Sequence, residues 1–261
     1  PWAIGIPGFP VKSPMTHFEL LARTADLGVP VCQICDNMPL HSLDDKVLRL
    51  LGSEARSKGI SLEVGTRGIA DAWLHSYLHI CSVLKSRVLR TLVEKEEVLE
   101  DPTELAERIK PLLHELSQRG VVLVIENYEA YTSGWLHRLV SEIGSPNVRV
   151  CLDPVNCFGI SEDPSRVVST LGPLVGNLHI KDYRITREEH KLGYRITGAP
   201  AGAGVLQIHE LIESLDPSDE LSAVIELWTP FQGSVEASVR LERDWAKQSV
   251  ENLRRILPDA K

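Results

Sequence analysis

The 261-residue sequence predicts an α/β fold, a (β/α)₈ TIM barrel that forms a single domain over residues 1–261. Two observations predict it. Eight short segments rich in β-branched apolar residues alternate with longer amphipathic segments along the chain. No glycine-rich turn follows the first of them, as it often does in open, doubly wound sheets. Strands that alternate with helices pair in parallel, and eight such units close a barrel.

The expected strands and helices follow from these patterns. The strands are expected at residues 2–6, 31–35, 61–64, 88–93, 121–126, 148–152, 176–181 and 223–227. Residues 43–58, 103–118 and 235–257 carry apolar side chains at the three- and four-residue spacing of amphipathic helices. Asp101 precedes Pro102 at an expected helix start, and Gly120 and Gly144 follow expected helix ends.

The composition indicates a soluble, cytoplasmic protein with no nucleic-acid or membrane partner. Hydrophobic residues make up 43% of the chain, enough for one large core, but the longest purely apolar run, residues 121–125, is far too short to span a bilayer. The net charge of −8 lacks the basic character of nucleic-acid binders. The five cysteines are an odd number and are scattered, which is typical of a reducing compartment rather than of a disulfide framework.

The connection at residues 183–204 is exceptionally long for a compact domain. It contains Arg187 among four basic residues, and then Gly198, Pro200, Gly202 and Gly204. We expect a substrate-covering loop with glycine and proline hinges. A mobile surface excursion is the alternative.

Four consecutive expected strands end in ionisable side chains, and in such barrels the chemistry lies where strands end. The fifth strand ends at Glu126, Asp153 follows the sixth, the seventh contains His179, and the eighth contains Glu226. Three converging carboxylates repel one another unless a cation compensates them. One divalent ion would do so, and three oxygens with one imidazole suit Mn²⁺ or Mg²⁺ best, although Zn²⁺ and Co²⁺ remain open. The alternative for His179 is a hydrogen-bonded core residue.

The chain resembles the xylose-isomerase-like TIM barrel superfamily, the group of sugar phosphate isomerases/epimerases and endonuclease-IV-like proteins. The residues that carry the resemblance are Ile125-Glu126-Asn127-Tyr128, Cys151-Leu152-Asp153-Pro154-Val155-Asn156, His179-Ile180-Lys181-Asp182, Gly202-Ala203-Gly204 and Ile225-Glu226. The resemblance implies a metal bound by Glu126, Asp153, His179 and Glu226, with the two glutamates on opposite faces of the substrate. It also implies a homodimer.

Two departures from the family pattern limit what the resemblance implies. Many members have histidine three residues after the aspartate, whereas this chain has Asn156, which can hydrogen-bond a substrate hydroxyl but cannot carry a proton. No Asp-x-His string follows His179, so the multi-histidine site of the DNA-repair branch is missing. DNA repair is therefore disfavoured.

Three functions are weighed. The first is a metal-dependent isomerase or epimerase that acts through an enediolate on a small ketose or related sugar acid, with Glu126 and Glu226 as acid and base. The second is a lyase, a decarboxylase or dehydratase of an oxo sugar acid, because Arg90, Lys181 and Arg187 could hold a carboxylate. The third is a non-catalytic barrel that binds a sugar.

Further side chains are expected near the substrate. Asn127 follows Glu126 directly, and Trp228 lies two residues beyond Glu226, where it is expected to floor the pocket. Glu63, inside the third strand, is expected either to contribute to the site or only to pair with Arg90 inside the barrel.

Overall fold

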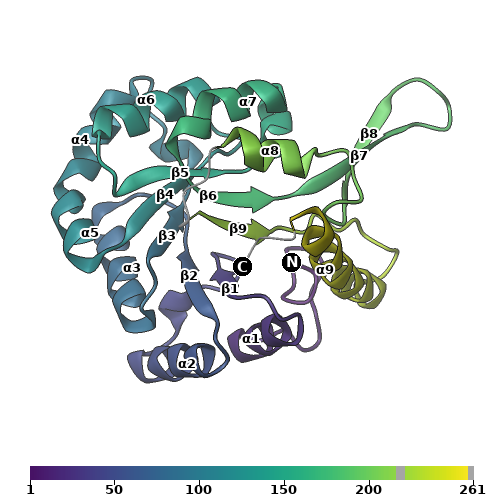
Figure 1. Cartoon of the computed structure of the whole chain (residues 1–261), viewed down its shortest axis with the longest axis horizontal. Helices are drawn as coiled ribbons and strands as arrows, with labels where there is room; N and C mark the ends of the chain where they lie inside the picture. The colour runs from purple at the N-terminus through teal and green to yellow at the C-terminus, as the bar shows by residue number, and fades with distance from the viewer. Residues whose placement is uncertain (216–220, 258–261) are drawn as a thin grey trace.

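A parallel sheet curved into a nearly closed barrel forms the centre of the computed structural model, which describes residues 1–215 and 221–257 (Figure 1). In this part of the chain seven strands pair in parallel, in the order β1-β2-β3-β4-β5-β6-β9. They are β1 (Val31–Ile34), β2 (Ser61–Gly65), β3 (Val88–Thr91), β4 (Val122–Glu126), β5 (Val148–Leu152), β6 (Val175–Ile180) and β9 (Ser222–Ile225). The edge strands β1 and β9 approach each other, so the barrel fold is confirmed.

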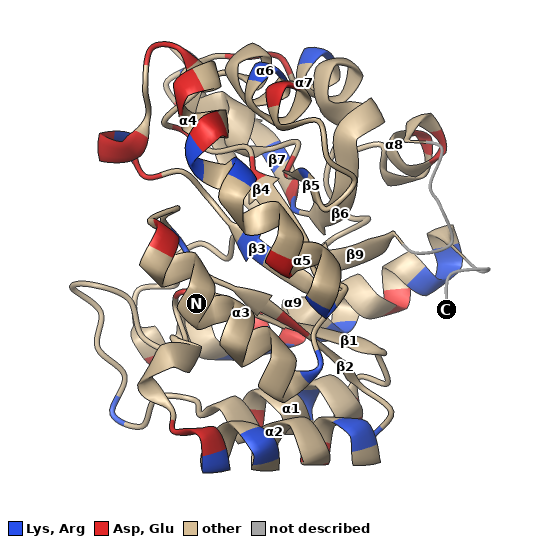
Figure 2. Cartoon of the chain, turned by 90° about the vertical axis from the view of Figure 1, so that its left-hand side faces the viewer, with Lys and Arg blue, Asp and Glu red and all other residues tan. Residues whose placement is uncertain are grey.

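Helices surround the sheet (Figure 1). Their bounds are α1 (His17–Asp26), α2 (Asp45–Ser57), α3 (Asp71–Leu84), α4 (Pro102–Ile109), α5 (Leu113–Arg119), α6 (Ser133–Ile143), α7 (Pro164–Leu171), α8 (Ile208–Ser214) and α9 (Val235–Ile256). Figure 2 shows basic and acidic residues interspersed on the outer helices of one side. Of the helices in the described ranges, none is long and apolar enough to cross a membrane.

Local chemistry sets the helix boundaries. Asp101 caps α4 by accepting a hydrogen bond from the Thr103 amide, and Pro102 occupies the first turn, where its missing N–H costs nothing. The single helix expected at residues 103–118 is wrong, because Pro111 interrupts the hydrogen-bond ladder and a 3₁₀ turn separates α4 from α5. Gly120 ends α5 in the left-handed conformation.

The strand expected at residues 2–6 is wrong. This segment is a turn, and only Ile6 makes an isolated bridge, to Phe9. Its backbone amides are hydrogen-bonded to a helix instead of a strand. Those of Trp2 and Ala3 donate to the two carboxylate oxygens of Glu242 in α9, at 2.9 and 3.0 Å. Amides bound to a helix side chain cannot also pair with a neighbouring strand.

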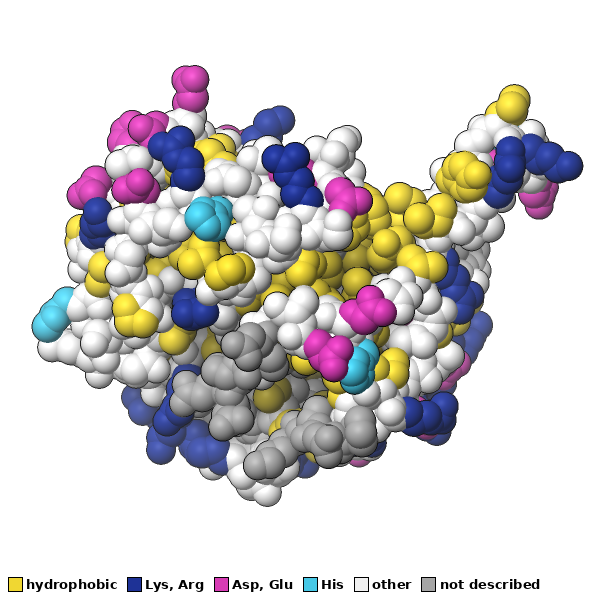
Figure 3. Space-filling model, turned by 45° about the horizontal axis from the view of Figure 1, so that its top comes forward, with side chains coloured by type: hydrophobic (Ala, Val, Ile, Leu, Met, Phe, Trp, Pro, Cys, Tyr) yellow, Lys and Arg dark blue, Asp and Glu magenta, His cyan; other side chains and the backbone are white. Residues whose placement is uncertain are grey.

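The segment expected to be a covering loop is an antiparallel hairpin of β7 (Asp182–Arg187) and β8 (Tyr194–Ala199). It projects from the body of the molecule as an arm (Figures 1 and 3). At its far end Leu192 is 85% exposed. The arm therefore points away from the barrel, and the interpretation of a lid is wrong for this structure.

The glycines after the hairpin form a fixed turn rather than a hinge. The buried carboxylate of Asp182 accepts hydrogen bonds from the amides of Gly202 and Gly204 through Oδ2, at 2.9 and 2.8 Å, and from that of Leu206 through Oδ1. A Cβ atom at Gly204 would lie 2.1 Å from Asp182 Oδ1, so only glycine allows this approach.

Candidate metal centre and active site

A cavity of about 920 Å³ opens where the parallel strands end. The pocket takes residues from β1, β3, β4, β6 and β9 and from the loops that follow them, and also from α1, α9 and the N-terminal segment. The predicted site residues among those that line it are Arg90, Glu126, Asn156, His179, Lys181 and Glu226.

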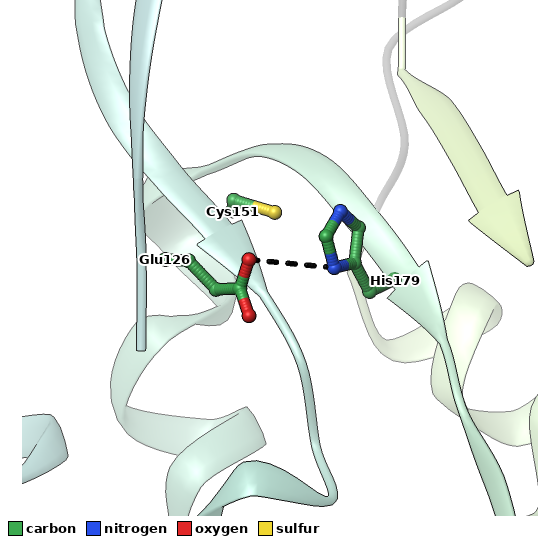
Figure 4. Close-up of side chains that lie close together, drawn as sticks. All are labelled: Glu126, Cys151 and His179. Atoms are coloured by element: carbon green, nitrogen blue, oxygen red, sulfur yellow. Dashed lines mark ion pairs between the residues drawn. The ribbon is translucent and has the colours of Figure 1, made fainter. Parts of the chain in front are cut away.

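The four predicted metal ligands converge. Each of Glu126, Asp153, His179 and Glu226 offers one ligand atom, and these atoms lie within 4.8 Å of one another. His179 Nδ1 is 2.9 Å from Glu226 Oε2 and 3.4 Å from Glu126 Oε2. Figure 4 shows the Glu126 carboxylate and the His179 ring facing each other from neighbouring parts of the barrel.

Two atoms of this cluster fit a metal ion. Asp153 Oδ2 and His179 Nδ1 are buried and make no well-directed hydrogen bond in the described part of the chain, although Lys181 Nζ lies 2.6 Å from Oδ2 and Glu226 Oε2 lies 2.9 Å from Nδ1. Buried polar atoms are normally hydrogen-bonded, so two such atoms in one cluster are available as ligands. A carboxylate oxygen and an imidazole nitrogen are both ligands for a divalent ion, and the donor set therefore fits such an ion.

The charges around the cluster also fit a dication. Arg90 pairs with Asp36 and Glu126 at 3.1 and 2.5 Å, and Lys181 pairs with Asp153 and Glu226 at 2.6 and 2.8 Å. Arg67 extends this network by pairing with Asp36 and Glu94 at 3.5 and 2.6 Å. The five carboxylates outnumber the three cations by two charges, and one divalent ion would neutralise these.

Cys151 also lies beside Glu126 and His179 (Figure 4). Burial raises the pKa of its thiol to about 11, and its Sγ donates to Asn177 Oδ1 at 3.3 Å. A protonated thiol that is already hydrogen-bonded is a poor ligand, because the thiolate is the form that binds metals. The oxygen- and nitrogen-containing set is therefore the better candidate.

The carboxylates of Glu126 and Glu226 differ in their hydrogen bonds and in their exposure to solvent. Both oxygens of Glu126 are engaged, since Oε2 accepts from Arg90 Nε at 2.5 Å and Oε1 accepts from Asn156 Nδ2 at 2.8 Å. The Glu126 side chain is 2% exposed, whereas that of Glu226 is 40% exposed and opens to the pocket. Only Glu226 combines contact with the cluster and access to solvent.

Burial and charge shift the protonation equilibria of the site. Burial lowers the pKa of Lys181, but Asp153 and Glu226 outweigh it and hold the pKa above its usual range. Burial raises the pKa of Glu226, but Lys181 and His179 reverse the effect and bring that pKa well below its usual range. Both groups are therefore charged in the resting site.

Four predicted substrate-binding residues, namely Arg187, Trp228, Glu63 and Asn127, do not line the pocket. Arg187 lies on the hairpin, where its guanidinium donates to the Lys191 carbonyl. Trp228 is 48% exposed and packs its backbone against Gly198 at the base of the arm. Glu63 points into the barrel interior and accepts hydrogen bonds from Gln33 and other side chains, not from Arg90.

Asn127 binds the backbone of Asp153 and does not line the pocket. Its amide group donates to the Asp153 carbonyl at 2.7 Å and accepts from the Asp153 amide at 2.8 Å. This pair of hydrogen bonds ties the end of β4 to the end of β5. Asn127 therefore positions a ligand rather than facing the pocket.

Some pocket residues that contact the cluster were not among the predicted ones. Gln33, Cys35 and Asp36 line the cavity from β1 and the turn after it. Asp36 pairs with Arg90, and Gln33 contacts His179. The signal was present in the sequence, because Gln33 is a polar residue in an apolar strand and Asp36 follows that strand directly.

Comparisons with known proteins agree with this architecture. The model of a family described as xylose isomerase-like TIM barrel matches residues 21–256. The chain is 33% identical over 244 residues to the 3-oxo-isoapionate decarboxylase of Pectobacterium atrosepticum, an alignment that covers 93% of this chain and 89% of that protein.

Solved structures share the fold at low sequence identity. A D-psicose 3-epimerase from Clostridium cellulolyticum H10, solved with D-tagatose, superposes with a TM-score of 0.68 at 18% identity, over 91% of this chain and 92% of the other. A xylose isomerase-like TIM barrel protein from Mycobacterium smegmatis, solved with magnesium, superposes with a TM-score of 0.64 at 16% identity, over 90% and 87% of the two chains.

Proposed function

This chain belongs to the xylose isomerase-like TIM barrel family, and on that premise we propose that it is a divalent-metal-dependent lyase that releases carbon dioxide from a 3-oxo sugar acid. The observation that carries the proposal is the asymmetry of the two glutamates. Epimerisation needs a proton exchanger on each face of the substrate, whereas decarboxylation needs one proton donor and no base. The similarity to a 3-oxo acid decarboxylase along nearly the whole chain supports the same reading.

Four residues would hold the metal ion: Glu126, Asp153, His179 and Glu226. When bound, a divalent ion supplies Lewis-acid charge that lowers the free energy of an enolate. Mn²⁺ and Mg²⁺ are the ions that best suit three carboxylates and one imidazole.

The reaction that this site would perform breaks one carbon–carbon bond. The bond between the carboxylate and the carbon next to the ketone breaks, its electron pair passes to the ketone to give an enolate, and carbon dioxide leaves. The enolate carbon then takes up one proton. Electrons and atoms balance with a single proton as co-reactant.

The chain has a pair of residues suited to deliver that proton. Lys181 Nζ lies 2.8 Å from Glu226 Oε1, and both residues line the pocket. Because Glu226 is ionised in the resting site, the transferable proton of this pair lies on the Lys181 ammonium. We assign proton delivery to Lys181, and to Glu226 the orientation of that ammonium.

Glu126 has a different role in this proposal. Arg90 and Asn156 fix both of its oxygens, so it holds its orientation while the substrate reacts. Preorganised groups of this kind stabilise a transition state without reorganising. Arg90 is engaged by Glu126, Asp36 and the Thr66 carbonyl, so this cation is not free to bind a substrate carboxylate.

The isomerase or epimerase that the sequence analysis ranks first is the second candidate. Its support is that both glutamates lie in the ligand cluster. The same assay separates the two activities. Mn²⁺-loaded protein is incubated in D₂O with 3-oxo sugar acids labelled with ¹³C in the carboxylate, and in parallel with ketoses.

The lyase proposal expects labelled carbon dioxide and one deuterium at the carbon that lost it. Deuterium exchange or a new epimer from the ketoses, with no carbon dioxide from any acid, would replace the lyase with the epimerase. Binding of a sugar without either reaction would refute both enzyme proposals and support a non-catalytic sugar-binding barrel.

A further inference from the structure

A connected polar network lies inside the barrel beneath the carboxylate cluster. Its members come from four strands: Gln33 on β1, Glu63 on β2, Asn177 on β6 and Ser222 on β9. Glu63 is 6% exposed and Asn177 is fully buried. A buried network of this kind is costly unless each group has a partner, so its arrangement is restricted.

The network fixes which way the Gln33 amide points. In the sheet register Gln33 lies opposite Glu63, and its Nε2 donates to Glu63 Oε2 at 2.9 Å and to Asn177 Oδ1 at 3.1 Å. Carboxylate oxygens only accept hydrogen bonds, so the NH₂ group must face Glu63. Asn177 Nδ2 donates to Ser222 Oγ at 2.7 Å, which leaves its oxygen as an acceptor for Gln33.

With its NH₂ group facing Glu63, Gln33 presents its oxygen to the active site. Gln33 Oε1 lies 2.8 Å from His179 Nε2 and also accepts from Cys35 Sγ at 3.2 Å. An amide oxygen cannot donate, so the proton between Gln33 and His179 belongs to Nε2. The other ring nitrogen, Nδ1, faces Glu126, as Figure 4 shows.

We propose that Gln33, oriented by Glu63, is a positioning residue that keeps the His179 ring protonated at Nε2 and so directs Nδ1 to the metal ion. The inference rests on the metal centre of the proposed function. A ligand histidine commonly donates its second N–H to an outer acceptor that fixes the tautomer and the ring orientation, and loss of such a partner typically weakens metal binding about 10- to 100-fold.

Two variants test the chain of hydrogen bonds from Glu63 through Gln33 to His179. Gln33→Met keeps the length of the side chain and removes both polar groups, and Glu63→Gln keeps the shape but replaces one of the two acceptor oxygens with a donor, so that position 63 no longer fixes which end of the Gln33 amide faces it. Gln118→Met, on the exposed surface of α5, is the matched control. For each protein, Zn²⁺ affinity is measured by calorimetry, and thermal unfolding of the metal-free protein reports on folding.

A spectroscopic measurement identifies the ligating nitrogen. Two-bond ¹H–¹⁵N correlation spectra of histidine-labelled, Zn²⁺-loaded protein distinguish a protonated from a metal-bound nitrogen. We expect His179 to be protonated at Nε2 and ligated through Nδ1 in the wild type. We expect Zn²⁺ affinity to fall at least 10-fold in Gln33→Met, by a smaller factor in Glu63→Gln, and not at all in Gln118→Met.

Ligation through Nε2 in the wild type would overturn the inference. So would Gln33→Met protein that folds and binds Zn²⁺ within about twofold of the wild type. Failure of the proposed function looks different, because a wild type that binds Zn²⁺ through Nδ1 but releases no carbon dioxide would refute the lyase and leave the inference intact. A wild type that binds no divalent ion would refute both.

Discussion

Arg90 and Glu126 form a buried ion pair in which Arg90 Nε lies 2.5 Å from Glu126 Oε2, with 8% and 2% of the two side chains exposed. Removal of one member of such a pair leaves a buried charge without compensation. Arg90→Met should therefore lower the free energy of unfolding by about 3–5 kcal/mol.

The control for this prediction is Arg108→Met, which breaks an exposed pair with Glu104 in α4. Exposed pairs of this kind contribute about 0–1 kcal/mol. Urea unfolding of the metal-free proteins measures both changes. Equal losses of stability in the two variants would show that the Arg90 pair is not structural.

Glu226 is predicted to be the residue whose loss affects turnover most selectively. Glu226→Gln should keep the fold and lower kcat for carbon dioxide release by a factor on the order of 10²–10⁴, the usual contribution of a positioned acid or base, because it removes the carboxylate that orients the Lys181 ammonium. Glu213→Gln, which alters an exposed glutamate on α8, should leave kcat unchanged. Steady-state assays with saturating Mn²⁺ make the comparison, and near-normal kcat for Glu226→Gln would remove it from the mechanism.

The hairpin arm is predicted to be dispensable for chemistry. Because the Arg187 guanidinium binds the Lys191 carbonyl and stacks over Tyr194 at 5.7 Å, it is engaged within the arm and away from the pocket. Arg187→Ala should keep kcat and KM within about twofold of the wild type. A large rise in KM would mean that the arm closes over the substrate during turnover.

The buried thiol of Cys157 gives a pH-dependent prediction. Burial raises its pKa to about 12, so the folded state retains a proton that the unfolded state loses near pH 9. Stability should therefore fall as the pH rises above about 9, and the thiol should react slowly with a thiol reagent at pH 8 until urea unfolds the protein. Cys157→Ser identifies the signal, and fast labelling of the native wild type at this position would contradict the burial.

The sequence was sufficient to predict the barrel and the convergence of the four proposed ligands, because both depend on local patterns. Apolar strands and their polar ends repeat along the chain, and parallel pairing brings those ends together. Glu126, Asp153, His179 and Glu226 all follow this rule.

What the sequence could not predict depends on partners distant in the chain. Trp2 fails to form a strand because Glu242, 240 residues away, takes its amide. Arg90 pairs with Glu126 rather than with Glu63 because the arginine points toward the strand ends while Glu63 points into the interior. The role proposed for Gln33 depends on its register with Glu63. No local periodicity encodes these choices.

The most direct test of the account is the number of divalent ions that each chain binds. Equilibrium dialysis against Mn²⁺ followed by elemental analysis should give one ion per chain for the wild type, and almost none for Asp153→Asn or His179→Ala at the same free Mn²⁺ concentration. A folded wild type that binds no ion, or variants that bind as much as the wild type, would contradict the proposal that these residues form a metal centre.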